Sequence, residues 1–327
     1  MIARRRFVLA LGVSTLAAPL VAFGQQQRKV PRIGFLMSET LSNDSSRIEA
    51  LRAGLRDHGY VEGKNIAIEI RSADGNYDRL PGLAVELASL KVDVIVALGG
   101  KAVSAAKEAT TTIPIVFPAM GDPVALGLSS GLARPGGNIT GSVAFYYEVS
   151  AKGLEILKEA VPRISRVAVL LNPANAGSSL GLQAIRATAN ALHVELQAFD
   201  VRNAKEIGAI FASIAERRIE AIVVGSDTLF RANFGEITSL AAKQRLPSAG
   251  SREFVAAGGL IGYGVDSLAL YRHAAYFVDR LLKGARPADL PIERATRLEL
   301  VINLKTAKAL DINIPQALLL RANDVIR

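Results

Sequence analysis

The stretch VDVIVALGGKAVSAAKEATTTIPIVFPA, Val92 to Ala119, contains two apolar segments separated by an amphipathic one. The outer segments, VDVIVAL and IPIVFPA, are rich in aliphatic and β-branched residues, which favour buried strands. The segment KAVSAAKEAT between them predicts a helix. A strand, a helix and a second strand in this order predict two parallel strands joined by a right-handed crossover. The stretch therefore predicts an α/β fold.

The same alternation runs along the rest of the chain and occurs twice. Apolar segments of the first half include Ile33, Ile66, Val94 and Pro114, and those of the second half include Val167, Val194, Ile222 and Pro247. Corresponding positions are offset by 134, 128, 128 and 133 residues. The chain of 327 residues also exceeds what one hydrophobic core usually supports. We therefore expect two similar lobes, each a small doubly wound parallel sheet.

Composition agrees with this fold and argues against two classes of protein. Half of the residues (50%) are hydrophobic, only 6% are aromatic and none is Trp, so Ala, Val, Ile and Leu must fill the core. The formal net charge is +9, but the basic residues are spread out and form no stripe interleaved with aromatic residues. We therefore expect no nucleic-acid partner. The chain has no cysteine, which excludes disulfides and a lipid anchor on cysteine.

The first residues have the pattern of an export signal. Three arginines at positions 4–6 precede an uncharged apolar run over residues 7–21, and small residues follow it. We interpret residues 1–24 as a cleavable signal peptide and expect a periplasmic protein that is not a lipoprotein. The start also resembles a twin-arginine signal, from which Ala3 and Leu9 depart. The alternative is a short membrane anchor, although the run is short for a membrane span.

Candidate ligand contacts follow from the fold, because doubly wound sheets bind ligands outside the carboxyl ends of their strands. At these ends, and in one expected connection between the lobes, the candidates are Ser38, Gly100, Lys101, Asp122, Asn175, Ser178, Asp227 and Tyr263. Those at helix starts lie near free backbone N–H groups, which suit a carboxylate. The two aspartates suit a ligand ammonium group. For each aspartate the alternative is a helix N-cap.

No pattern in the chain indicates catalysis, a cofactor or a metal. His58, His193 and His273 are scattered and have no metal-ligand spacing. The segment Gly225-Ser226-Asp227 does not fit a nucleophile elbow. Gly99-Gly100 lies between a strand and a helix but lacks the spacing of a dinucleotide-binding or phosphate-binding loop. We therefore expect a binding protein without a cofactor, not an enzyme.

Seven segments in sequence order resemble the substrate-binding proteins of ABC transporters, in the tryptophan/tyrosine-type group. They are GLRDHGYVEGKNIAIEIRSADG, LKVDVIVALGG, IPIVFPAMGDPVALGL, ARPGGNITG, GLEILKEAVPRISRVAVLLNP, YRHAAYFVDRLLKGARPADLPIE and VINLKTAKALDINIP. The resemblance covers nearly all of the chain after the leader. One difference is Gly99-Gly100-Lys101, where the family often has a Thr-Pro pair after the glycine.

The resemblance implies a type I periplasmic binding-protein fold, with two doubly wound lobes joined by three crossover segments. The lobes are then expected at residues 28–139 with 265–298 and at residues 140–264 with 299–327. The crossovers are expected within residues 137–145, 259–266 and 297–303.

The resemblance also implies a function. The protein would capture a small molecule by closure of its lobes and deliver it to the permease of an ABC importer in the inner membrane. An amino acid, including an aromatic one, or a similar small carboxylate is the expected ligand, and we expect a monomer. The alternatives are a ligand-sensing protein for a membrane receptor and an exported α/β enzyme.

Overall fold

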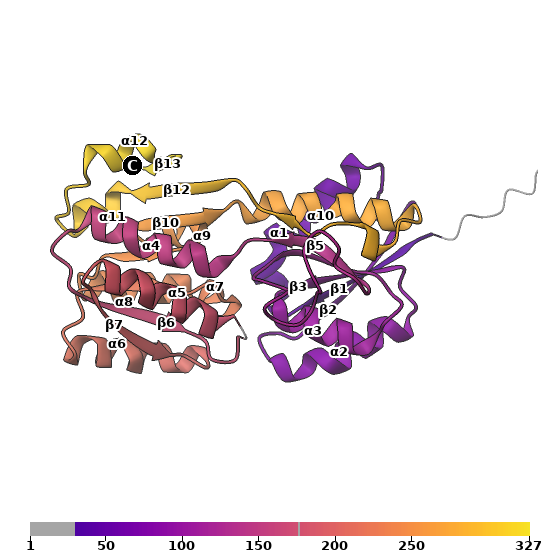
Figure 1. The fold of residues 1–327 in the computed structure, drawn as a ribbon, viewed down its shortest axis with the longest axis horizontal. Coiled ribbons are helices and arrows are strands. Elements are labelled where there is room, and N and C mark those ends of the chain that lie inside the picture. Colours follow the sequence, from indigo (N-terminus) through magenta and orange to yellow (C-terminus); the bar gives the residue numbers. More distant parts are fainter. Residues whose placement is uncertain (1–29, 176) are drawn as a thin grey trace, which may run out of the picture. The chain divides into compact units, whose positions relative to one another are not determined.

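The structure is a computed structural model that describes residues 30–175 and 177–327. The predicted signal peptide, residues 1–24, lies outside the described residues. Among those residues, no helix is both long and apolar enough to cross a membrane. The described chain forms two α/β lobes, each built on one sheet (Figure 1).

The first lobe contains a six-stranded sheet of order β11-β5-β4-β3-β1-β2, in which neighbouring strands are parallel. Its strands are β1 (Arg32–Met37), β2 (Ala67–Ser72), β3 (Val94–Leu98), β4 (Ile115–Met120), β5 (Ile139–Val143) and β11 (Glu293–Arg294). Its helices are α1 (Leu41–Asp57), α2 (Leu80–Ser89), α3 (Gly100–Ala109) and α10 (Ser267–Leu282), with 3-10 turns η1 (Tyr77–Arg79) and η3 (Pro287–Asp289). This arrangement confirms the parallel sheet expected from the stretch 92–119.

The strands β1, β3 and β4 in the interior of the first sheet are buried on both faces. Ile33, Phe35 and Met37 of β1 pack in one core cluster with α1 and α10, whereas Leu36 packs with α2 and α3 on the other face. Side chains alternate between the two faces of a strand, so a strand covered on both sides must be apolar throughout. This explains why the strand segments read as continuous apolar runs.

The second lobe contains a seven-stranded sheet of order β13-β12-β10-β9-β8-β6-β7. Its strands are β6 (Arg166–Leu171), β7 (Glu195–Asp200), β8 (Ala221–Val224), β9 (Ser248–Gly250), β10 (Ile261–Val265), β12 (Leu298–Asn303) and β13 (Asp324–Ile326). Its helices are α4 (Tyr146–Ala160), α5 (Ser178–Ala191), α6 (Ile207–Glu216), α7 (Thr228–Ala232), α8 (Phe234–Lys243), α9 (Arg252–Ala256), α11 (Leu304–Ala309) and α12 (Gln316–Arg321), with the 3-10 turn η2 (Ala204–Glu206). Only β10 and β12 pair antiparallel among these strands.

The chain passes between the two sheets three times, at residues 144–145, at residue 266 and at residues 295–297. The expected start of the second lobe at residue 140 is wrong, because it falls inside β5, which pairs with β4 in the first sheet. The expected boundaries at residues 265 and 298 are each one residue off, because Val265 ends β10 and Leu298 begins β12 in the second sheet.

Two local features hold β5 in the first sheet. The amide of Asn138 donates hydrogen bonds to the carbonyl oxygens of Thr110 (3.0 Å) and Ile113 (2.9 Å), which fixes the chain just before the strand. Gly141 lies close to β4, where an added Cβ would be 2.0 Å from the carbonyl oxygen of Phe117. A residue with a side chain would not fit at this position, so the glycine permits the pairing.

A second close approach joins α1 to α10, which lie side by side in Figure 1. An added Cβ at Gly54 of α1 would be 2.1 Å from the carbonyl oxygen of Arg272 in α10 and 2.8 Å from the Cβ of Ala275. The glycine therefore sets how near the two helix backbones come. This contact attaches α10 to the first lobe directly after the chain leaves β10.

We expect Gly54→Ala to lower the free energy of unfolding by about 1–3 kcal/mol, because the new methyl group must push the two helices apart. Thermal or urea unfolding followed by circular dichroism measures the effect. The matched control is Gly82→Ala in α2, where an added Cβ meets no described atom within 4 Å. There the gain in helix propensity should stabilise the protein by about 0.5 kcal/mol. Equal effects of the two substitutions would contradict the packing argument.

Candidate ligand-binding site

A cavity with a volume of about 200 Å³ is lined by residues from both lobes. Its lining includes the residues that follow β1, β3 and β4 in the first lobe and those that follow β6, β8 and β9 in the second. The carboxyl ends of parallel strands lie at one edge of a sheet, so each lobe contributes a row of polar loops and helix starts. The cavity is thus built from the part of each sheet where ligands bind in doubly wound folds.

All the sequence-predicted contact residues lie on this one cavity. The lining includes Ser38, Gly100, Lys101, Asp122, Asn175, Ser178, Asp227 and Tyr263. The structure therefore brings together residues that are up to 225 positions apart in the sequence, from Ser38 to Tyr263. Their role as ligand contacts remains a prediction.

The start of α3 presents main-chain groups to the cavity. Gly99 has a φ of +88°, which favours glycine, and within the described chain no side chain caps this helix. The first N–H groups of a helix have no partner inside the helix, so those of Gly100 and Lys101 are available to a ligand. The positive end of the helix dipole and the exposed Lys101 ammonium both favour an anion here.

Asp227 is half-buried and acts as the N-cap of α7. Its Oδ1 accepts hydrogen bonds from the backbone N–H of Leu229 (2.8 Å) and from the side-chain amide of Asn172 (3.0 Å). Its Oδ2 accepts one from the side-chain amide of Asn175 (2.8 Å). Burial raises the pKa of Asp227 above its usual value, although these donors act in the opposite direction. In the structure this carboxylate therefore makes the hydrogen bonds of a helix N-cap, which was the alternative to a ligand contact.

Asp122 also caps a turn. Its Oδ1 accepts hydrogen bonds from the backbone N–H groups of Val124 (2.9 Å) and Ala125 (3.1 Å), just after β4. Its Oδ2 lies 3.5 Å from the hydroxyl of Tyr147, at the start of α4. One oxygen thus holds the turn, while the other retains acceptor capacity on the cavity lining.

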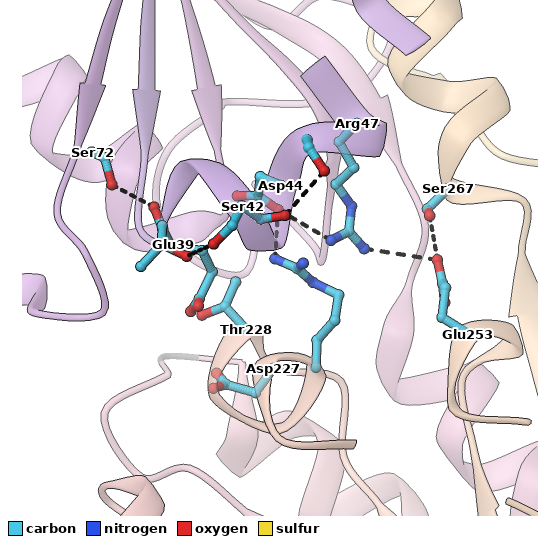
Figure 2. A network of polar contacts seen from close by, with 12 residues as sticks. Glu39, Ser42, Asp44, Arg47, Ser72, Asp227, Thr228, Glu253 and Ser267 are labelled. Atoms are coloured by element: carbon cyan, nitrogen blue, oxygen red, sulfur yellow. Dashed lines mark hydrogen bonds and ion pairs between the residues drawn. The ribbon is translucent and has the colours of Figure 1, made fainter. Parts of the chain in front are cut away.

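Four charged residues of the lining were missed by the sequence analysis, and Figure 2 labels Asp44, Arg47 and Glu253 among them. Asp44 of α1 has a side chain that is 2% exposed, and its Oδ1 lies 3.2 Å from Nη1 of Arg47 and 2.8 Å from Nη2 of Arg231 in α7. Nη2 of Arg47 lies 3.7 Å from Oε1 of Glu253 in α9. These contacts alternate in charge and join the two lobes.

Hydroxyl groups make further contacts in the same region. The Ser267 hydroxyl donates to Glu253, and Figure 2 shows this pair beside Arg47. Burial acts to raise the pKa of Glu253, but this hydrogen bond and the Arg47 guanidinium outweigh it, so the pKa lies below its usual value. The hydroxyl of Tyr77 lies 2.6 Å from Oγ1 of Thr228, which adds a hydrogen bond between the lobes.

The sequence contained a signal for Asp44. It lies four, seven and eleven residues before Ile48, Leu51 and Leu55, which form the buried face of α1. An acidic residue on the apolar face of a helix must find a charged or hydrogen-bonded partner when it is buried. The spacing identifies the buried carboxylate, but not the arginine from the other lobe that pairs with it.

The sequence profile of the family described as ABC transporter substrate binding protein matches residues 39–326. This chain belongs to that family. A curated relative, the tyrosine-binding protein of Clostridioides difficile (strain R20291), is 29% identical over 258 residues, which cover 79% of this chain and 74% of the relative. The family and the fold are those of substrate-binding proteins, as the sequence resemblance implied.

Two solved structures resemble this ABC transporter substrate-binding protein over most of its length. The ABC domain from Streptococcus pneumoniae in complex with L-Trp has a TM-score of 0.82 and 25% identity, and the match covers 90% of this chain and 100% of that chain. A conserved domain protein from Vibrio cholerae O1 biovar eltor has a TM-score of 0.85 and 26% identity, over 91% of this chain and 100% of that chain. The fold is the type I periplasmic binding-protein fold, which confirms the expected fold class.

We expect Asp227→Ala to lower the free energy of unfolding by about 2 kcal/mol, because it removes a helix cap and the acceptor of two side-chain amides. Chemical unfolding of the ligand-free protein measures this loss. The control is Asp200→Ala at the end of β7, an exposed carboxylate whose ion pair with Arg202 spans 3.4 Å. The control should change stability by less than about 0.5 kcal/mol. A fully stable Asp227→Ala protein would remove the structural role assigned to this residue.

Proposed function

We propose that this protein is a periplasmic solute-binding protein that captures an amino acid, or a similar small carboxylate, and delivers it to an ABC importer. The observation that carries the proposal is the cavity whose polar lining comes from the strand ends of both lobes. A ligand in such a cavity contacts both lobes only when they are closed. Its binding therefore shifts the protein towards the closed state.

The chemistry of the lining supports an amino acid. The start of α3, with Gly100 and Lys101, offers backbone N–H groups and positive charge to a carboxylate. Asp122 and Asp227 offer oxygen acceptors to an ammonium group. A zwitterion carries both groups, so one ligand uses both parts of the lining.

The size and walls of the cavity support a ligand with an apolar side chain. A cavity of roughly 150 Å³ can hold benzene, and this one has about 200 Å³. Its aromatic lining includes Tyr146, Tyr147, Phe230 and Tyr263. The relatives point the same way, because one is named a tyrosine-binding protein and another was solved with L-Trp. We therefore infer that the ligand class includes aromatic amino acids.

The remaining parts of the proposal concern export and partners. The basic and apolar leader, residues 1–24, supports export to the periplasm by a cleavable signal, and the absence of cysteine supports a protein without a lipid anchor. In the periplasm the closed form would dock, as a monomer, on the permease of an ABC importer. Membership of the substrate-binding family supports this partner.

Isothermal titration of the refolded, ligand-free protein against a panel of amino acids and small carboxylates tests the proposal. We expect saturable binding of at least one amino acid. We also expect Lys101→Ala to weaken that binding roughly tenfold, because a charge-assisted contact to the ligand carboxylate is lost. Lys64→Ala, at an exposed position outside the cavity lining, is the matched control and should leave the affinity unchanged. If no small solute binds, the proposed function is wrong.

Asp122→Ala tests the acidic side of the cavity. We expect it to lower ligand affinity more than it lowers the melting temperature, because one carboxylate oxygen caps a partly exposed turn while the other faces a tyrosine of the lining. Titration and thermal unfolding of the same preparation measure the two effects. The reverse result, a lower melting temperature with full affinity, would leave Asp122 with the cap as its only role.

A further inference from the structure

Three of the polar contacts that join the lobes link α1 and η1 of the first lobe to α7 and α9 of the second. They are the ion pair of Asp44 with Arg231 (2.8 Å), the ion pair of Arg47 with Glu253 (3.7 Å) and the hydrogen bond of Tyr77 with Thr228 (2.6 Å). In each contact the first residue belongs to the first lobe and the second to the second lobe. We call these six residues the interlobe latch.

The pair of Asp44 with Arg231 is the more buried of the two ion pairs in the latch. The Asp44 side chain is 2% exposed and the Arg231 side chain is 16% exposed, so little water screens their charges. Exposed ion pairs contribute little to stability, but a pair that is largely removed from water interacts more strongly. Because Arg47 of the same lobe also contacts Asp44 at 3.2 Å, the carboxylate lies between two guanidinium groups.

The latch exists only when the lobes are together. Rotation of one lobe away from the other separates Asp44 from Arg231 and Arg47 from Glu253, and it breaks the Tyr77 hydrogen bond. In the open state water replaces these partners at the surface of each lobe. The latch therefore favours the closed state by an amount that does not depend on which ligand is present.

The carboxylates of the latch already have hydrogen-bond and ion-pair partners within the protein. The Asp44 carboxylate accepts from two guanidinium groups, and the Glu253 carboxylate accepts from Ser267 and lies near Arg47, as Figure 2 shows. A ligand that bound to these groups would have to displace their protein partners. The groups at the start of α3 offer a ligand donors without such competition.

We propose that Asp44 and Arg231 are positioning residues that set the affinity of the protein for all its ligands through the closing equilibrium. The inference rests on the proposed function, because it assumes that ligands bind the closed form. The apparent dissociation constant rises when the binding-competent closed state is less populated. Loss of the latch should thus lower the affinity for every ligand by the same factor. Loss of a residue that contacts the ligand should instead lower the affinity by a factor that differs between ligands.

The test compares Asp44→Asn and Arg231→Gln with the unaltered protein. We expect titration with at least three ligands of different side chains to show the same loss of affinity, roughly tenfold, for each ligand. A tenfold loss corresponds to about 1.4 kcal/mol in the free energy of lobe closure. The double variant should lose no more than either single variant, because both remove one shared contact. Arg231→Gln, whose side chain is less buried, keeps the test valid if Asp44→Asn folds poorly.

The matched control is Asp279→Asn in α10. This carboxylate is also buried, with a side chain 6% exposed, and it pairs with Lys283 at 2.8 Å and accepts from Tyr60 at 3.0 Å. All three residues lie in the first lobe and outside the cavity lining. The control should leave every affinity unchanged, even if it lowers the melting temperature.

Small-angle X-ray scattering of the ligand-free proteins gives a readout that needs no ligand. We expect both latch variants to have a larger radius of gyration than the unaltered protein and the Asp279→Asn control. An unchanged radius, or losses of affinity that differ between ligands, would overturn the latch. If the unaltered protein binds no small solute, the proposed function fails, and the scattering experiment alone then decides whether the latch exists.

Discussion

The close approach of α1 and α10 is the contact on which the site depends. Gly54 lets the two helix backbones come together, and this attaches to the first lobe a helix that follows directly from β10 of the second. The contact also fixes α1, which presents Asp44 and Arg47 at the cavity. The start of α10 provides Ser267 for the Glu253 carboxylate. One packing contact thus positions Asp44, Arg47 and Ser267, the polar groups that the first lobe presents to Arg231 and Glu253 of the second.

The two aspartates show why capping and ligand binding are compatible. A carboxylate has two oxygens with several lone pairs, so it can hold a turn with one oxygen and still accept a further hydrogen bond. Asp122 uses Oδ1 for the turn after β4, while Asp227 uses both oxygens and draws two asparagine amides to the same edge of the second sheet. The hydrogen bonds that both carboxylates accept from backbone N–H groups keep the loops at the strand ends in place. A rigid loop in turn presents a ligand with fixed groups.

Much of this fold could be predicted from the sequence, because the order of strands and helices restricts how a sheet can form. Alternating strands and helices determine a parallel sheet, and a parallel sheet places its strand ends at one edge. The cavity lining accordingly includes Ser38, Asp122 and Asp227 from strand ends, whereas Tyr263, which was expected in a crossover, lies within β10. The lobe boundary at residue 140 failed because the pairing of β5 depends on the Asn138 amide and on the missing Cβ of Gly141, which periodicity does not reveal. The latch was missed because its charge pairs join distant helices.

The antiparallel pairing of β10 with β12 limits how the lobes move. The ladder runs from the pair Ile261 and Ile302 to the pair Val265 and Leu298, and it stops just before the chain crosses to the first lobe. One strand leaves the second lobe where the other arrives, and hydrogen bonds prevent them from sliding past each other. The lobe closure proposed above is therefore expected to be a rotation at residues 144–145, 266 and 295–297, where the chain crosses between the sheets. Closure by such a rotation needs changes in a few backbone dihedral angles and no rearrangement of either core.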